Sequence, residues 1–165
     1  MELFRDALKR LEKSKLFKDW KKKNKGSYLS SGFAIVEKEQ SPWKAGYYDS
    51  KTNKIASFVI DKKVNLEPEG DIFQKKKVKI DEIDLHKLLV ELPQAVVIGN
   101  NLQQEKYKGD NPIKIIAILQ NIGKQQIWNL IFVTQKFNTL NIRVDTENGD
   151  IIDHKIASIM DFKKD

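Results

Sequence analysis

The sequence predicts an α+β protein made of two units, in each of which a helical segment is followed by an antiparallel β-meander. Three observations support this prediction. Apolar residues follow helical spacing up to Gly26 and strand-like patterns after it, and the same order begins again near Asp84. Two β regions, from Phe33 and from Leu130, repeat one order of strands and turns. A chain of 165 residues buries roughly 68–70% of its unfolded surface, which is enough for a core without disulfides.

The first helical segment is expected to contain two helices. An apolar stripe runs along residues 3–11, and the next apolar residues, between positions 16 and 20, would lie on the opposite side of one straight helix. A break at Ser14, which is suited to an N-cap, lets a second helix over Lys15–Asn24 turn its apolar side back to the core. Lysines in its last turn and the following Gly26 are typical of a helix C-terminus.

Strand patterns follow these two helices. Three β-prone runs are separated by short polar links, and the second link has the composition of a turn. A polar stretch over Lys62–Lys77 predicts a linker, and alternation around Val78 and Ile80 predicts one short strand at its end. The three strands of the predicted meander are Tyr28–Glu37, Trp43–Tyr48 and Ile55–Ile60.

The second unit begins with new helical signals. Asp84 is a candidate N-cap for a helix over Leu85–Leu92, and Pro93 suits the first turn of another helix that runs to about Tyr107. Four strand-like runs follow. The third is the most distinct because apolar and polar residues alternate along it, as in a strand with one buried and one wet face. These runs are Ile113–Leu119, Ile127–Thr134, Thr139–Asp145 and Ile151–Ile156.

The two β regions can be aligned as an internal repeat. Phe33 then pairs with Leu130, and Asp49 pairs with Asp145 after one residue of slippage. A duplication would explain the shared order, and so would the general pattern of β-meanders, so both explanations stay open. Whether the two units share one sheet is open as well. The units are residues 1–61 and 81–165, joined by a linker with a short strand over residues 62–80.

The second unit carries a run of neighbouring motifs. The strand Trp128–Thr134 precedes Leu140–Asp145, which ends in the sequence aliphatic-x-aliphatic-Asp, and the turn Thr146–Gly149 leads into Asp150–Ile152. On these residues the unit resembles the PepSY family, in which a helix packs on a small antiparallel sheet. The match covers about residues 85–156.

The resemblance has implications for function. A fainter copy covers residues 3–60, where Asn53 and Lys54 stand in place of the turn glycine. The PepSY resemblance implies a non-catalytic module, and some members of the family are proposed to restrain peptidases. A helix wrapped by a meander is also similar to cystatins, whose Gln-Val-Gly loop has a near match at Gln94–Gly99, a segment predicted to be helical. We therefore predict a binding module for a protein or peptide, with regulation of a peptidase as one role.

The composition excludes several chemistries. Without cysteine the chain has no thiol nucleophile, disulfide or Cys-ligated zinc site, and two histidines are too few for most histidine metal sites. His86 and His154 lie near acids at spacings that do not bring their side chains together, and the acids of residues 145–153 lack the ligand order of an EF-hand. The sequence has no phosphate-binding loop or nucleophile motif. We predict no enzymatic activity, no catalytic residue, no metal site and no cofactor.

A binding surface is predicted on the outward side of the strands. Trp43, Ala45 and Tyr47 would share one strand face, which we assign to the core because it is entirely apolar or aromatic. Polar residues on the opposite face of the same and later strands are free to contact a partner. The residues predicted to do so are Lys44, Tyr48, Asn141 and Arg143.

The net charge of +7 lies almost entirely in residues 1–25, which carry +6. An anion-binding role would therefore concern one helical segment. Nucleic-acid binding through this segment is the alternative function, although arginine, the residue best suited to recognise bases and phosphates, is rare here. The lysines that would contact phosphates are Lys15, Lys18, Lys21, Lys22, Lys23 and Lys25.

The expected location is the cytoplasm. The first residues mix acids and bases at helical spacing, which is unlike a secretory signal. No apolar run approaches the roughly 20 residues that span a bilayer, so no membrane span is predicted. The sequence does not predict an oligomeric state.

Overall fold

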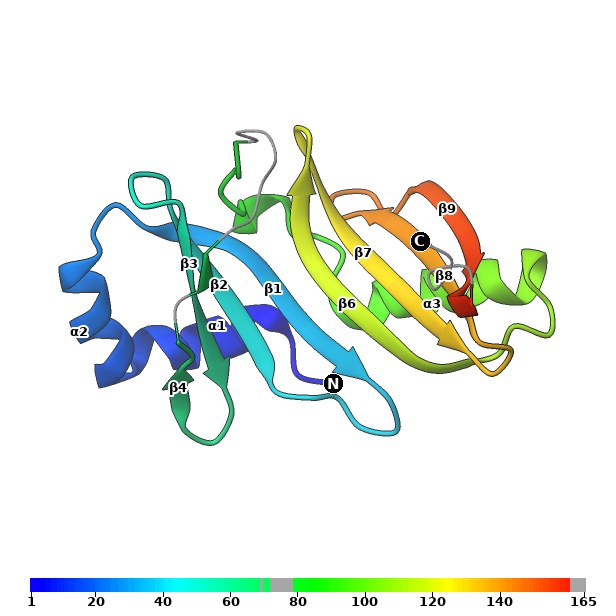
Figure 1. Ribbon diagram of the computed structural model, residues 1–165, viewed down its shortest axis with the longest axis horizontal. Helices are drawn as coiled ribbons and strands as arrows, with labels where there is room; N and C mark the ends of the chain where they lie inside the picture. The colour runs from blue at the N-terminus through cyan, green and yellow to red at the C-terminus, as the bar shows by residue number, and fades with distance from the viewer. Residues whose placement is uncertain (69, 72–78, 161–165) are drawn as a thin grey trace.

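The computed structural model describes residues 1–68, 70–71 and 79–160, and contains one continuous antiparallel sheet with the α-helices on one face (Figure 1). Its elements are α1 (Phe4–Lys13), α2 (Lys15–Lys23), β1 (Tyr28–Val36), β2 (Trp43–Asp49), β3 (Lys54–Ile60), β4 (Val64–Leu66), β5 (Gly70–Asp71), the 3₁₀ helix η1 (Leu85–Lys87), α3 (Leu92–Lys106), β6 (Pro112–Ile122), β7 (Gln125–Thr134), β8 (Asn138–Asp145) and β9 (Ile151–Ser158). The strand order is β4-β3-β2-β1-β6-β7-β8-β9, and β5 also pairs with β3. The predicted α+β class is confirmed.

The two predicted units meet at β1 and β6, which pair in antiparallel orientation. Ala34 lies opposite Ala117, and beside this pair Phe33 lies opposite Ile118. The hydrogen-bond ladder therefore continues from one unit into the other. The alignment of Phe33 with Leu130 does not follow this arrangement, because Phe33 is in the strand at the junction and Leu130 is in β7, one strand further out. The internal duplication itself stays a prediction.

The core lies between the sheet and the helices, and two tryptophans lie at its centre. Trp43 in β2 and Trp128 in β7 are fully buried, and their ring centroids are 6.0 Å apart. The indole N–H of Trp43 donates to the carbonyl of Glu2, just before α1, at 3.0 Å. That of Trp128 donates to the carbonyl of Val90, just before α3, at 2.8 Å. Each unit thus fixes the start of its long helix to the second strand from the junction.

The helix break at Ser14 is confirmed. The Ser14 hydroxyl accepts a hydrogen bond from the backbone N–H of Phe17 at 3.2 Å and so caps α2. Beyond this cap, α2 packs Phe17 and Trp20 against the rings of Tyr47 and Phe58 on the helix-facing side of the sheet. The change of direction between the helices therefore lets α2 cover the outer strands of the first unit.

The predicted helix over Leu85–Leu92 is wrong in its extent. Only the single turn of η1 forms there, with the Asp84 side chain as its cap. The N–H groups of Leu89 and Val90 donate to the carbonyl of Thr146, in the turn between β8 and β9, so the helix does not continue. The next predicted helix is confirmed as α3, with its proline in the first turn.

The predicted linker contains two short strands. β4 and β5 pair with β3 and extend the sheet into the stretch Lys62–Lys77. Strands of three and two residues show too little periodicity to be recognised in a sequence. Of the strand predicted around Val78 and Ile80, Val78 lies outside the described residues and Ile80 is not in a strand. The other predicted strands are confirmed.

Candidate binding face of the sheet

The sheet has two faces, and the helices of the described residues cover only one of them. In Figure 1, α1 and α3 pass behind the strands, so the view looks onto the other, outer face. Successive side chains of a strand point to opposite faces. Ala34, Ala117 and Leu130 are fully buried on the helix-facing side, which places their sequence neighbours on the outer face. We define the apolar strip as six of the apolar residues that β1, β6 and β7 place there: Phe33, Ile35, Ile116, Ile118, Ile131 and Val133.

The apolar strip is continuous across three strands. Phe33 lies opposite Ile118, and Ile35 lies opposite Ile116. Ile116 also lies opposite Ile131 of β7. Opposed residues of an antiparallel pair hold their Cβ atoms about 4.5–5.5 Å apart, so these side chains pack on one another. All six residues remain partly exposed, because within the described chain they are covered by each other and by no helix.

The strip has a border of paired charges. On one side the Lys44 ammonium lies 2.8 Å from a Glu67 carboxylate oxygen and 5.9 Å from the centroid of the Phe33 ring. On the other side Arg143 forms an ion pair with Asp153 at 3.3 Å. These groups are half-exposed, so the border offers charges of both signs to a molecule that covers the strip.

Three of the four predicted binding residues lie on this border, but they do not form one site. Lys44 is in β2, whereas Asn141 and Arg143 are in β8, and β1, β6 and β7 lie between them. Neighbouring strands are about 4.8 Å apart, so roughly 19 Å of sheet separates the two groups. The Asn141 amide donates to the Asn129 side-chain oxygen at 2.8 Å. The residue pattern therefore places three predicted residues on the borders of the strip and does not identify the strip itself, and their role in binding stays a prediction.

The prediction that Tyr48 is an exposed binding residue is wrong. Its side chain is only 7% exposed, its ring lies edge-on to that of Tyr28 at 5.8 Å, and its hydroxyl donates to the Asn53 side-chain oxygen at 2.9 Å. Tyr28 in turn donates its hydroxyl to the carbonyl of Ile80. Partial burial, Tyr48 and nearby acidic groups raise the pKa of Tyr28. Tyr48 therefore holds this end of the sheet together and is not available to a partner.

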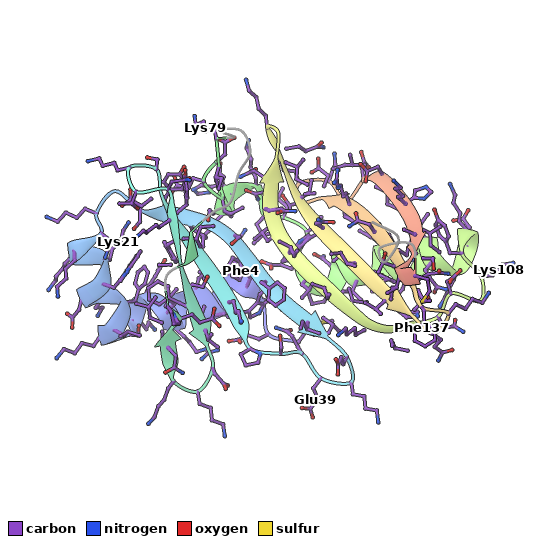
Figure 2. All side chains as sticks on the ribbon, in the orientation of Figure 1. Phe4, Lys21, Glu39, Lys79, Lys108 and Phe137 are labelled. Carbon is purple, nitrogen blue, oxygen red and sulfur yellow. The ribbon has the colours of Figure 1, made fainter. Side chains whose placement is uncertain are left out.

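The predicted anion-binding lysines lie at one end of the molecule. α2 forms that end, and Figure 2 labels Lys21 there, with Lys108 at the opposite end. Lys21 donates to the backbone carbonyl of Ser27, which fixes its ammonium group. The others are exposed and form no ion pair within the described residues: Lys15, Lys18, Lys22, Lys23 and Lys25.

A histidine and an acid that could do chemistry take part in structural hydrogen bonds. His154 Nδ1 hydrogen-bonds with the Tyr107 hydroxyl beside an open groove of about 430 Å³ between α3 and β9. Asp145 accepts from the backbone N–H of Glu147 at 2.7 Å. Although partial burial acts in the opposite direction, this bond and one from Gln125 lower the pKa of Asp145. Among the described residues, no three His, Asp or Glu side chains are grouped to hold a metal ion.

Comparison with known proteins supports the fold and leaves function open. No known protein family matches the sequence, and no curated protein matches it. Among solved structures the chain is similar to a candidate lipoprotein from Clostridium difficile 630, with 12% identity and a TM-score of 0.56 over 86% of this chain and 90% of that one. The PepSY resemblance therefore stays a prediction. Within the described residues, no helix has both the length and the apolar character needed to cross a membrane.

Proposed function

We propose that the protein is a non-catalytic binding module and that a partner protein covers the apolar strip. The sequence of the central strands carries this proposal. An antiparallel strand with one solvated face alternates apolar and polar residues, as β8 does. β6 and β7 instead contain the continuous apolar runs Ile115–Leu119 and Leu130–Val133, a composition typical of strands that are covered on both faces. Helices of the protein bury one of these faces. The exposed apolar residues on the other face support a contact with another molecule there.

The border of the strip favours a polypeptide as this partner. Protein interfaces combine an apolar centre with a polar rim of hydrogen-bonding and charged groups. Here the rim consists of the ion pairs of Lys44 with Glu67 and of Arg143 with Asp153, together with the amide of Asn141. The resemblance to the PepSY family supports the same class of partner and makes a peptidase one candidate. A cytoplasmic location stays a prediction.

Site-specific photocrosslinking tests the proposal. A photoreactive phenylalanine analogue in place of Ile118 should crosslink a partner protein in an extract of the native organism. The same analogue in place of Val97, which is 57% exposed on α3, is the matched control and should not. With that partner purified, Ile131→Lys should weaken binding roughly tenfold or more, because it puts a charge into the apolar strip. Equal crosslinking from both positions would contradict the proposal.

Sedimentation separates a partner protein from a second copy of this chain. We expect a monomer for the wild-type chain and for Ile131→Lys, with circular dichroism to verify that the variant folds. A wild-type dimer that Ile131→Lys dissociates would show that the strip serves self-association, and the proposed function would then be wrong.

A further inference from the structure

We propose that one end of the molecule binds the surface of an anionic lipid bilayer. The lysines at this end are separate from the apolar strip, which occupies the middle of the sheet. The two proposals can therefore be tested independently. We define the basic end as the exposed lysines of α1, α2 and the residues between and after them: Lys9, Lys13, Lys15, Lys18, Lys22, Lys23 and Lys25.

The lysines of the basic end carry charge that no ion pair offsets within the part of the chain that the structure describes. Glu12 and Asp19 are the only acids in residues 9–25. α1 ends at Lys13 and α2 begins at Lys15, so the lysines of α2 follow directly on the last turn of α1, and Figure 2 labels Lys21 at this end of the long axis. Such a cluster attracts a negatively charged surface at a distance of about a Debye length.

Three observations favour lipid headgroups over nucleic acid as the anionic surface. Arg10, the arginine nearest to these lysines in sequence, is held by the Glu2 carboxylate at 2.9 Å, and arginine is the residue that recognises nucleic-acid phosphates and bases best. The aromatic rings of α2, Phe17 and Trp20, pack against Phe58 of the sheet instead of forming an open platform on which bases could stack. α2 instead exposes Leu16, 42% accessible, next to Lys15. An exposed apolar side chain on a lysine-rich helix suits the interface of an anionic bilayer.

Vesicle cosedimentation with the full chain measures this binding. The probes are vesicles of phosphatidylcholine alone and of phosphatidylcholine mixed with phosphatidylglycerol. We expect binding to the mixed vesicles only, with a loss of binding as salt is raised, because salt screens the attraction between exposed lysines and the lipid surface.

Two matched charge variants locate the site. The variant Lys15→Gln, Lys18→Gln, Lys22→Gln, Lys23→Gln should lower binding more than about tenfold, because each lysine near an anionic surface contributes about fivefold. The control Lys106→Gln, Lys108→Gln, Lys124→Gln, Lys136→Gln removes the same charge from exposed positions elsewhere and should lower it less than about threefold. Leu16→Ser should lower it about threefold and leave the salt dependence unchanged. Circular dichroism verifies that every variant folds.

Several outcomes would overturn the inference. Equal binding to both kinds of vesicle would remove the role of charge, and equal losses in the two quadruple variants would show that the net charge acts without the basic end. Failure to bind either vesicle at low salt would also overturn it. Tighter binding to mixed-sequence duplex DNA or RNA than to the mixed vesicles at the same salt would do so too, in favour of the nucleic-acid alternative.

Discussion

The two faces of the sheet are built from similar residues and have different surroundings. Along β7, Leu130 and Phe132 are fully buried under α3, whereas Ile131 and Val133 lie on the outer face and are partly exposed. Burial therefore cannot be inferred from the residue type of these strands. It depends on which face the chain itself covers. The apolar composition of a strand therefore indicates how many of its faces can be buried. The topology decides which of these faces is buried by other parts of the same molecule.

Neighbouring residues of β7 give the largest expected contrast between the faces. Leu130→Ala deletes a fully buried side chain and should lower the free energy of unfolding by about 2–5 kcal/mol. Ile131→Ala should lower it by about 1 kcal/mol, because its side chain is already partly in water. Urea unfolding at several protein concentrations measures both values. Equal losses would mean that the outer face is buried in the isolated protein and would break the comparison.

An exchange of shape-matched residues gives a smaller contrast. Val144→Thr in β8 places a hydroxyl in the core and should lower the free energy of unfolding by about 1–3 kcal/mol. Val133→Thr on the outer face should change it by less than about 0.5 kcal/mol, since water can solvate the new hydroxyl. Thermal unfolding of the two variants beside the wild type tests this. A destabilised Val133→Thr would show that water does not reach the strip.

The hydrogen bonds of the two tryptophans test how the helices are attached to the covered face of the sheet. Trp43→Phe and Trp128→Phe each remove a bond that fixes the start of a helix and should cost about 1–2 kcal/mol. The effects should not add in the double variant, because the rings are close to each other. Urea unfolding of the wild type, the two single variants and the double variant provides a double-mutant cycle that measures the coupling between the two tryptophans. Additive losses would show that the two helix attachments are independent.

The smallest effect is expected at the border of the outer face. Lys44→Gln breaks the half-exposed ion pair with Glu67 and should change the free energy of unfolding by less than about 0.5 kcal/mol. Urea unfolding at low and high salt measures the change. A larger loss at low salt would assign the border a structural role, which the comparison of the two faces does not predict.

How well the sequence predicts each face follows from its pattern. In β8 the alternation alone assigns Leu140, Ile142 and Val144 to the core, and all three are fully buried. In β6 and β7 both faces are apolar, so the pattern predicts strands and cannot identify the apolar strip. That identification needs the strand order and the side on which the helices lie. The lysines of α2 could be located from the sequence because their exposure follows from helical spacing and charge.

The errors come from contacts between distant segments. The outward direction of Tyr48 follows from strand alternation with Lys44, but its burial comes from Tyr28 on another strand. The helix predicted over Leu85–Leu92 stops after η1 because Thr146, in a later hairpin, supplies hydrogen-bond partners that compete with helical ones. Local patterns carry no information on such partners.

The ladder between β1 and β6 also sets an order of events during synthesis. β1 is complete long before its partner exists, since Ala34 must wait for Ala117. A ribosome adds about 5–20 residues per second, so this apolar strand keeps an open edge for several seconds. Open strand edges are where chains pair wrongly or exchange strands. The same ladder that makes the finished molecule continuous therefore makes its nascent and refolding forms most vulnerable to mispairing at high concentration.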